Sequence, residues 1–271
     1  MCLGTGTLHG YLGDTMADWL IEWIETNRLL GISHFHISNG TASLGPRMRA
    51  IFNYYESLGV LVLSHFPPPV QHLERFKLDS ARDIADISMR VALNDCMYRN
   101  MYRYRFIAIF DLDEIIMPER HTTLTDMLSE LYPRSDFGPN REPPSFVFSS
   151  RLYVPFNTFE HKNTGSSNTS LTISSNRFYL RMKHHRLIKR ILNPRNCIVI
   201  STHWCLRPVG LIQEIKDNEH AFVHHYRSSY DHKYDRKIVR EDGPIEDKRV
   251  HRYIVAITGR VESVKKRLSI R

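Results

Sequence analysis

Three acidic side chains follow directly on a short apolar segment near the middle of the chain. Residues 105–118 read RFIAIFDLDEIIMP. The run Phe106–Phe110 is predicted to be a buried strand, because short runs rich in Ile and Phe between polar flanks are typical of strands covered on both faces. Side chains alternate along a strand, so Asp111 and Asp113 are expected on one face and Glu114 on the other.

Carboxylates that lie side by side repel one another, and a hard divalent cation between them removes the repulsion. In open α/β sheets, ligands bind at the carboxyl ends of the strands, which is where Asp111 and Asp113 are expected. The alternative is a solvated turn with incidental acids, but three acids directly after a wholly apolar strand are an unusual composition for a turn. The pattern therefore predicts a site for a divalent cation.

The residues before this segment alternate between helical and extended patterns. Apolar residues recur at helical spacing in Asp14–Leu30, and Gly31 is the expected stop. A strand, a second helix ended by Gly59, another strand and a third, long helix follow. Alternation of this kind predicts a layered α/β domain. The expected elements after the first helix are Ile32–Ile37, Arg47–Leu58, Val60–Ser64 and Asp79–Tyr102.

The composition changes after Pro133, beyond a short helix predicted at Thr125–Leu131. The segment Asn157–Asn176 is rich in Ser, Thr and Asn and is predicted to be a surface loop. The tail from Tyr230 onward is charged, with a mostly helical pattern. We interpret residues 1–271 as a single domain with halves at 1–132 and 133–271. The strands expected in the second half are Ser145–Val154, Cys197–Trp204 and Ala221–Tyr226.

The composition also limits the partners. A net charge of +8 fits an anionic ligand such as a nucleotide diphosphate, but the Lys and Arg residues are scattered, so no nucleic acid is expected to bind. The chain shows no apolar segment of transmembrane length and no signal peptide at Met1. Four cysteines allow three full pairings with no preference among them. Because no C-x-x-C motif is present, a structural zinc site is not expected.

Three blocks of the sequence carry a family resemblance. They are WLIEWIETNRLLGISHF at 19–35, LNDCMYRNMYRYRFIAIFDLDEIIMP at 93–118 and HHYR at 224–227. In residues, order and separation they resemble glycosyltransferase family 92, and the similarity extends from about Cys2 to Arg227. One departure is Ile115-Ile116, where many members have Phe-Ile, and it leaves the acids untouched.

The resemblance implies a GT-A type nucleotide-sugar-binding fold, which is an α/β fold with a mixed, mostly parallel central sheet flanked by helices. It implies an inverting, metal-dependent transfer of a sugar, galactose in this family, from a UDP-sugar to a glycan acceptor such as an N-glycan or another oligosaccharide. Residues 1–132 would form the nucleotide-sugar-binding half, and residues 133–271 the acceptor half with a helical tail. Family members normally sit behind a membrane anchor in the Golgi. The anchor is absent from this chain, so we expect the lumenal catalytic domain of a Golgi membrane enzyme.

The resemblance also suggests ligands for the metal. Mn²⁺ or Mg²⁺ neutralises a leaving diphosphate as a Lewis acid, and carboxylates are its natural ligands. Asp113 is expected to bind the metal directly, and Asp111 to contact the ribose or to bind the metal through water, with Glu114 behind them. A late histidine often completes such a site, and HHYR aligns best with His225 in that role. The alternative is that His224 and His225 are two core or surface histidines in a chain that has 15.

Further nucleotide contacts are expected from the first half of the chain. Asn39 ends the strand that begins at Ile32, and Asp95 lies on the helix before the acids. Arg227 would bind the diphosphate, since a guanidinium pairs well with phosphate oxygens. The alternative for Arg227 is an ordinary surface arginine.

The basic run Arg177–Arg190 offers Lys183, Arg186 and Lys189 toward the phosphates, but most of this run is expected to be a solvated face. His203 is expected to be structural, with a place in the site as the alternative. An inverting reaction also requires a base that takes a proton from the acceptor hydroxyl. No residue stands out, and the candidates in the acceptor half are Glu142, Glu160, Glu214 and Asp217.

Two other function classes stay open. Asp111-Leu112-Asp113 after an apolar strand resembles the nucleophile motif of haloacid-dehalogenase-type phosphatases. That motif usually has Thr or Val where Ile115 stands, and it usually opens its domain, whereas here a whole α/β segment precedes it. The other class is an inactive carbohydrate-binding protein, against which the intact acids argue.

Two N-x-S/T sequons matter only if the protein is lumenal. The sequon at Asn168 lies in the polar segment predicted to be a loop, so Asn168 is expected to carry a glycan. A site role for Asn39 and a glycan on Asn39 exclude each other.

Overall fold

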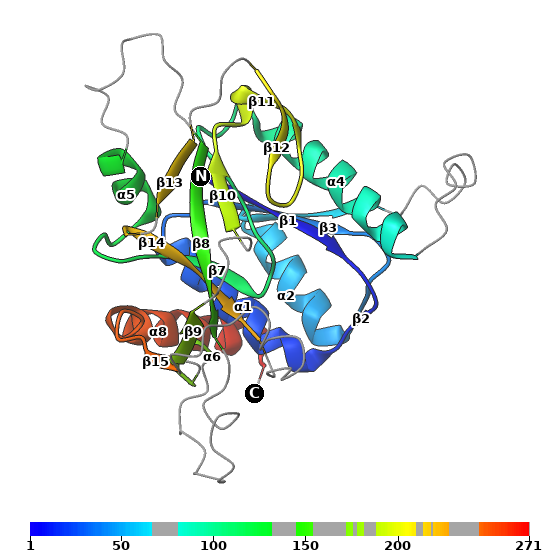
Figure 1. The fold of residues 1–271 in the computed structure, drawn as a ribbon. Coiled ribbons are helices and arrows are strands. Elements are labelled where there is room, and N and C mark those ends of the chain that lie inside the picture. Colours follow the sequence, from blue (N-terminus) through cyan, green and yellow to red (C-terminus); the bar gives the residue numbers. More distant parts are fainter. Residues whose placement is uncertain are drawn as a thin grey trace.

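A mixed β-sheet with helices on both faces forms the centre of the molecule (Figure 1). The computed structural model describes residues 1–66, 81–131, 145–153, 172–175, 178–181, 188–209, 214–217, 219–227 and 244–270. Four strands of the first half pair in parallel, and the strands of the second half continue the sheet with mainly antiparallel neighbours. The predicted fold class, an α/β fold with a mixed sheet flanked by helices, is confirmed.

The parallel strands stand in the order β6, β1, β3, β5. The antiparallel strand β10 closes this set on the β6 side and joins it to β8. The strand bounds are β1 Cys2–Leu8, β3 His34–Asn39, β5 Leu61–His65, β6 Ile107–Ile109, β8 Ser145–Tyr153 and β10 Ile188–Leu192.

The strand β1 was not predicted from the sequence, although it lies between β3 and β6 at the centre of the sheet. Its sequence, CLGTGTL, alternates small and polar residues and lacks the β-branched apolar run that marks a buried strand. The glycines have a packing role. A Cβ at Gly4 would lie 2.8 Å from the Cys96 sulfur, and one at Gly6 would lie 3.1 Å from the Met89 sulfur. Glycine therefore lets helix α4 (Ala81–Asn100) approach this strand closely.

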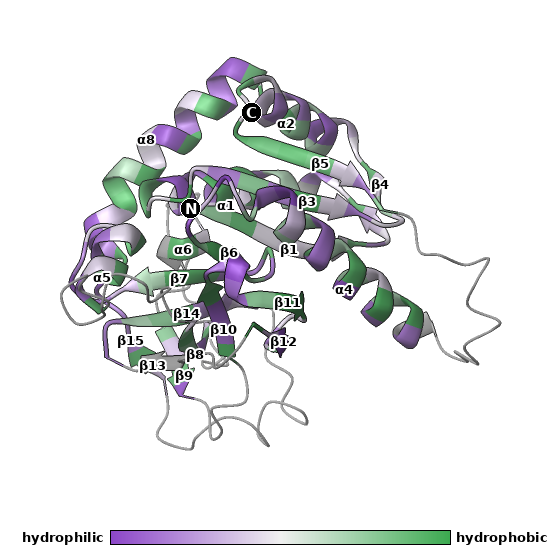
Figure 2. Ribbon diagram, turned by 90° about the horizontal axis from the view of Figure 1, so that it is seen from above, coloured by the Kyte–Doolittle hydropathy of each residue, from purple (hydrophilic) through white to green (hydrophobic). Residues whose placement is uncertain are grey.

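Helices cover the two faces of the sheet differently. Helix α4 and strand β11 share one apolar cluster with the central strands. Helices α1, α2, α5 and α8 contribute to a larger cluster on the other face, which also draws residues from both halves of the chain. Figure 1 shows α4 above the strands and α1 and α2 below them. Helices α4 and α8 are banded green and purple in Figure 2, as expected of helices with one buried face. The helix bounds are α1 Ala17–Leu29, α2 Pro46–Ser57, α5 Leu124–Leu131 and α8 His251–Leu268.

The predicted helices and strands of the first half lie within a few residues of the observed ones. Helix α1 ends at Leu29, and Gly31 follows it with a φ of +96°, a conformation that favours glycine. Short elements connect the first part of the chain. They are β2 Tyr11–Leu12, the 3-10 helix Asp14–Met16 and β4 Ser43–Leu44.

The prediction for the acidic segment needs a correction. Strand β6 already ends at Ile109, and a new strand, β7 (Glu114–Pro118), begins at the third acid. Residues 110–113 form a turn, with Glu114 N–H donating to the carbonyl of Asp111 at 3.1 Å. Asp111 and Asp113 therefore do not share the face of one strand, and Glu114 is not turned away from them.

The second half adds further strands around β8. Strand β14 (Ala221–Tyr226) was predicted with its exact bounds, and it lies between β7 and β8. Strand β13 (Glu214–Asp217) pairs in parallel with the other end of β8. Strand β9 (Phe178–Arg181) pairs with β8, and β15 (Ile245–Glu246) pairs with β9.

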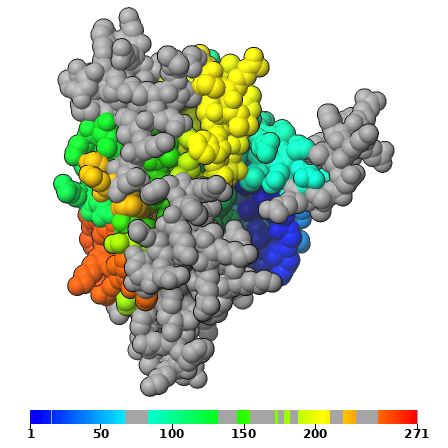
Figure 3. All heavy atoms as spheres, viewed as in Figure 1, coloured from blue at the N-terminus to red at the C-terminus, as the bar shows by residue number. Residues whose placement is uncertain are grey.

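A disulfide between Cys197 and Cys205 closes a small hairpin. The predicted strand Cys197–Trp204 is shorter in the structure: β11 ends at Ile200, and β12 (Cys205–Pro208) returns antiparallel to it, after a 3-10 helix at Pro194–Asn196. In the space-filling view this hairpin, in yellow, lies at the surface (Figure 3). Cys2 and Cys96 are buried and free.

Several predictions lie outside the described residues. They concern most of the loop Asn157–Asn176 with the sequon at Asn168, the start of the tail, and the side chains of Glu142, Glu160, Lys183 and Arg186. The last part of that predicted surface loop is wrong, because Thr172–Ser175 forms the short helix α6 and Ile173 is fully buried.

The helical pattern of the tail is confirmed by α8, which packs on α1. Its buried face consists of Tyr253, Ile257, Val261 and Val264. Two contacts to α1 flank this face: Lys265 Nζ lies 2.9 Å from Asp18 and Arg260 lies 3.6 Å from Glu25. Among the described helices, none is both long and apolar enough to cross a bilayer.

Helix α1 also holds α6 through a buried carboxylate. Glu22 accepts the backbone N–H groups of Thr172 and Ile173 at 2.8 and 2.6 Å. Burial raises the pKa of Glu22 to about 7, and these two donors oppose the rise. The folded protein thus binds this proton more tightly than the unfolded chain does, where the value is 4.5. The contribution of Glu22 to stability therefore falls as the pH rises through this interval and is constant above it.

We predict that Glu22→Gln removes this part of the pH dependence. In the wild-type protein, Glu22 should lower the free energy of unfolding by on the order of 3 kcal/mol between about pH 4.5 and pH 7. Urea unfolding at several pH values in this window measures the slope. The exposed Glu262→Gln variant is the matched control and should keep the wild-type slope. Parallel curves for wild type and Glu22→Gln would contradict the assignment.

Candidate metal centre

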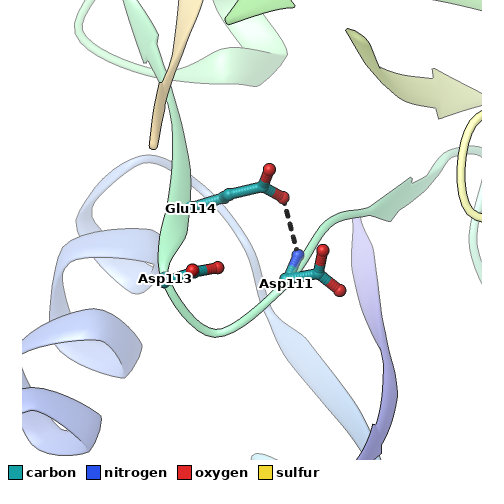
Figure 4. Close-up of side chains that lie close together, drawn as sticks. All are labelled: Asp111, Asp113 and Glu114. Carbon is teal, nitrogen blue, oxygen red and sulfur yellow. Dashed lines mark hydrogen bonds between the residues drawn. The ribbon is translucent and has the colours of Figure 1, made fainter. Parts of the chain in front are cut away.

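Three carboxylates converge at the turn between β6 and β7. One oxygen from each of Asp111, Asp113 and Glu114 lies within 4.8 Å of the other two. Figure 4 shows the three side chains gathered around the turn, with Glu114 extending from β7 toward Asp111. A Glu114 oxygen accepts the backbone N–H of Asp111 at 2.9 Å. Glu114 therefore belongs to the cluster, because the chain reverses between the acids and does not continue as one strand.

Three hydrogen bonds, two from helix α1 and one from strand β14, hold the backbone of this segment. The indole N–H groups of Trp19 and Trp23 donate to the carbonyls of Leu112 and Glu114 at 2.7 and 2.8 Å. The backbone N–H of Tyr226 donates to the carbonyl of Asp113 at 2.7 Å. Trp19 and Trp23 stand one helical turn apart on α1, so one face of a helix fixes the backbone on both sides of Asp113. The acids are thus carried by a rigid support.

A buried lysine faces two of the acids. Lys189 on β10 places its Nζ 2.7 Å from Asp111 Oδ2 and 2.8 Å from Glu114 Oε2, and its side chain is 3% exposed. Burial alone would lower the pKa of Lys189, but the two carboxylates outweigh burial and raise it. Burial raises the pKa of Glu114, and the charge of Lys189 opposes that rise. The prediction that most of the basic run is a solvated face is wrong for Lys189 and for its buried neighbour Arg190.

His225 approaches the cluster from β14. Its Nε2 lies 3.3 Å from Asp113 Oδ2, and its Nδ1 lies 3.6 Å from Glu114 Oε1. Burial would lower the pKa of His225, but the contact with Asp113 and the charge of Glu114 raise it. Burial would raise the pKa of Asp113, but His225 and Lys189 bring it below its usual value. The register explains the approach, because His225 stands opposite Glu114 on the neighbouring strand.

His224 points into the core instead. It is fully buried, it stacks on Tyr153 with ring centroids 4.2 Å apart, and it bonds to the hydroxyls of Tyr153 and Tyr226 at 3.0 and 3.1 Å. Its Nε2 also lies 3.4 Å from Asp247. Burial lowers the pKa of His224 to about 3, so the ring is neutral at physiological pH. The two adjacent histidines thus have different surroundings, and only His225 faces the acids.

The donor set fits a hard divalent cation. Carboxylate oxygens with one imidazole nitrogen suit Mn²⁺ or Mg²⁺. The side chains of Asp111 and Asp113 are 44% and 49% exposed, so an ion reaches them from solvent, while that of Glu114 is 3% exposed. Asp113, His225 and Asp111 are the residues that would hold the ion. Their metal-binding role stays a prediction.

The comparison with family models now decides the identity. The model of glycosyltransferase family 92 matches residues 12–255, which is most of the chain. The chain belongs to glycosyltransferase family 92. The GT-A expectation that came with the resemblance agrees with the mixed sheet of this family 92 chain and with acids at the end of a central strand. A comparison with curated protein sequences finds no match.

Solved structures offer only distant similarity. The family 92 chain is similar to galactosyltransferase LgtC in complex with donor and acceptor sugar analogues, at 11% identity and a TM-score of 0.30, over 72% of this chain and 58% of that one. The chain is also similar to an active-site mutant of LgtC, at 12% identity and a TM-score of 0.29, over 72% of this chain and 58% of that one. Its similarity to mouse xyloside xylosyltransferase 1 in the apo form has 13% identity and a TM-score of 0.30, over 72% of this chain and 67% of that one. The chain therefore spans 58% of the length of the LgtC structures. Similarity this weak supports no conclusion about substrate or mechanism.

The edge of the family 92 site includes residues that the sequence did not single out. A Cβ at Gly6, near the end of β1, would lie 3.1 Å from the Met89 sulfur and 3.5 Å from Asp111 Oδ1. Met89 is also contacted by the Thr202 hydroxyl at 3.5 Å, so the turn of the β11–β12 hairpin lies beside α4 at this edge. The pair of glycines in CLGTGTL was the available signal, since glycine in a strand often marks a close approach of other atoms.

The residues predicted to contact the nucleotide have other partners in this structure. The Asn39 amide bonds to the backbone of Ala42 through both its oxygen and its nitrogen, at 2.8 and 3.2 Å. Asp95 lies 2.7 Å from Arg99 and 4.0 Å from His36, farther along α4 than Met89. Their nucleotide contacts stay predictions.

The remaining candidates lie on or near the strands of the second half. Arg227 follows β14, its backbone N–H donates to the carbonyl of Tyr153 at 2.8 Å, and its charge acts on His225. His203 bonds to the carbonyl of Ile188 at 2.8 Å, a contact that suits a structural role. Of the proposed bases, Glu214 and Asp217 lie at the two ends of β13, opposite Ser145 and Phe148.

We predict opposite effects for the two adjacent histidines. His224→Ala should lower the free energy of unfolding by about 2–4 kcal/mol, because it leaves a cavity and removes buried hydrogen bonds, while Mn²⁺ affinity is kept. His225→Ala should weaken Mn²⁺ binding at least about tenfold, with a stability loss under about 1 kcal/mol. Urea unfolding and Mn²⁺ titration of both variants test this. Loss of Mn²⁺ affinity in a folded His224→Ala protein would reverse the assignment.

Proposed function

We propose that this chain is the catalytic domain of an inverting, metal-dependent glycosyltransferase that moves galactose from a UDP-sugar to a glycan acceptor. The observation that carries the proposal is the cluster of Asp111, Asp113 and His225 at the end of a central strand, in a chain that belongs to glycosyltransferase family 92. Galactose and inversion rest on the family resemblance alone. An N-glycan or another oligosaccharide is the proposed acceptor.

The metal site follows from the donor set. Asp113 and His225 would hold Mn²⁺ or Mg²⁺ directly, and Asp111 would bind it directly, through water, or contact the ribose. When bound, the ion would act as a Lewis acid that neutralises the diphosphate leaving group. The chain's own contribution is to fix these ligands before the donor arrives. The indoles of α1 fix the turn, and Lys189 fixes Asp111 and Glu114.

The proton of the acceptor hydroxyl needs a base in the same site. Among the candidate bases, Asp217 is favoured by its position in the sheet. It stands opposite Phe148 on β8, and Phe148 stands opposite Lys189 on β10, so Asp217 and Lys189 share one row across the sheet. Glu214 is three residues farther from that row. We therefore propose Asp217 ahead of Glu214 as the base to test first.

The proposed location is the Golgi membrane, with this chain as a lumenal catalytic domain. The disulfide Cys197–Cys205 supports an oxidising compartment. Of the two sequons, the one at Asn168 is proposed to carry an N-linked glycan, since the side-chain amide of Asn39 is hydrogen-bonded to the backbone of Ala42. Expression in secretory cells, followed by glycosidase treatment of wild type and Asn168→Gln, tests this. A natural protein found in the cytosol, with no anchor encoded upstream, would refute it.

A phosphatase and an inactive carbohydrate-binding protein are the two function classes that an assay has to separate from the proposed transferase. Donor dependence separates the three. A phosphatase releases phosphate from monoesters, a transferase requires a nucleotide sugar, and a binding protein turns nothing over.

We predict that UDP raises the melting temperature much more with Mn²⁺ than without it. Ligand that binds only the folded state at 100 times its Kd stabilises by about 2.7 kcal/mol, which for a domain of this size corresponds to roughly 5–10 °C. A thermal-shift series with UDP, GDP and AMP, each with Mn²⁺ or with EDTA, is the measurement. Equal shifts for the three nucleotides, or shifts that ignore the metal, would count against a UDP-sugar enzyme.

We predict that Asp113→Asn abolishes transfer in a folded protein. Asn keeps the shape of the side chain and one weak oxygen ligand but removes the charge, and loss of one such contact typically lowers the rate on the order of 100- to 1000-fold. Asp113 is half-exposed, so the melting temperature should change little.

The control variant is Leu112→Asn in the same turn. Leu112 packs against the hydrophobic core, so a polar side chain there should lower the melting temperature. Transfer rate and melting temperature are measured side by side for both variants. Near-normal turnover of Asp113→Asn at saturating Mn²⁺ and donor would show that this turn is not the metal site.

A further inference from the structure

The acids and Lys189 are arranged in two layers. Asp113 and one side of Asp111 face solvent, and Lys189 and Glu114 lie behind them with side chains only 3% exposed. Lys189 is therefore screened from an approaching diphosphate by the carboxylates that it contacts. Its ammonium occupies the inner side of the cluster, which is the position that an ion bound between Asp111 and Glu114 would need.

Both Glu114 oxygens already have partners. Oε2 accepts the backbone N–H of Asp111 at 2.9 Å and faces Lys189 Nζ at 2.8 Å. Oε1 faces His225 Nδ1 at 3.6 Å. Asp111 Oδ2 contacts Lys189, while Asp113, whose side chain is 49% exposed, contacts His225 through its Oδ2. The free ligand capacity of the cluster thus lies on the side of Asp113 and His225.

The net charge of the cluster also favours one cation on the side of Asp113 and His225. Three carboxylates and one ammonium carry a net charge of two negative units, which one divalent cation neutralises. Without the ammonium, the excess negative charge would lie between Asp111 and Glu114 and would attract an ion to that inner position. At the short distances involved, even one unit charge changes ion binding strongly.

We propose that Lys189 is a positioning residue that confines a single divalent cation to Asp113, His225 and the remaining oxygen of Asp111, and keeps Glu114 from coordinating it. The proposal rests on the metal-dependent function proposed above. Lys189 thus determines where the cation binds and does not bind the phosphates of the donor. Glu114 stabilises the turn and is not a metal ligand.

The first test compares Asp113→Asn with Glu114→Gln by Mn²⁺ titration, followed by electron paramagnetic resonance of the free ion. Loss of outer partners of metal sites typically weakens binding 10- to 100-fold, and loss of a direct ligand should exceed that range. We expect Asp113→Asn to weaken Mn²⁺ binding by well over about 100-fold and Glu114→Gln to weaken it by about 10- to 100-fold at most. A Glu114→Gln protein that loses Mn²⁺ as fully as Asp113→Asn would overturn the proposal.

The second test uses a rescue. Removing the ammonium frees Asp111 and Glu114, so the double variant Asp113→Asn, Lys189→Met should bind Mn²⁺ at least about tenfold more tightly than Asp113→Asn alone. In the single variant Lys189→Met, Mn²⁺ should bind at least as tightly as in the wild-type protein. The increase in Mn²⁺ affinity that UDP causes should be smaller by about tenfold or more, because the ion then lies between Asp111 and Glu114. A lysine that only stabilises the fold would give no rescue.

The variant Lys189→Arg keeps the positive charge but changes the shape of the side chain, and where it folds it should keep both wild-type Mn²⁺ affinity and its response to UDP within about threefold. Absence of rescue in a folded double variant would overturn the proposal. If Lys189→Met does not fold, the contrast between Asp113→Asn and Glu114→Gln still decides it. A wild-type protein that binds no Mn²⁺ would refute the metal-dependent function itself, and this inference with it.

Discussion

Like charges that lie close together in a partly buried site require an opposite charge nearby, and this requirement determines the structure at the centre of the molecule. Carboxylate oxygens of Asp111, Asp113 and Glu114 lie within 4.8 Å of one another, and the sheet brings the ammonium of Lys189 and the imidazole of His225 to them. The ammonium arrives because β10 runs antiparallel beside β6, which brings a residue of the second half across from the end of a strand of the first. The acidic turn and the closure of the sheet therefore depend on each other.

Helix α1 connects this centre to the rest of the molecule. Trp19 and Trp23 hold the turn, Glu22 holds α6, and Glu25 accepts the hydroxyl of Tyr55 at 2.9 Å. Helix α8 also packs on α1. Polar groups that would be unfavourable inside a core are satisfied here by backbone and side-chain partners from other segments. The block WLIEWIE thus encodes a set of tertiary contacts in addition to a helical propensity.

The sequence predicted the elements whose pattern is local. Helices α1 and α2 and strand β14 have periodic or alternating apolar residues, so their existence and approximate bounds follow from propensity and burial. Strand β1 was missed, since GTGT owes its place to the close approach of α4. The face of Glu114 was predicted wrongly, because no local pattern revealed a chain reversal after Ile109. Lys189 sits in a basic run of the kind that is usually solvated, and only the pairing of β10 with β6 shows otherwise.

The central position of β1 has a consequence for how the protein is made. Strand β1 pairs through Cys2 with Ile107, so at 5–20 residues per second it waits roughly 5–20 s during synthesis for that partner. The sheet then closes only when β10 has been synthesised. During this interval two strand edges stay open to other chains, and long-range pairing of this kind folds slowly. The nascent chain should therefore be most prone to aggregate in the interval before β10 is made.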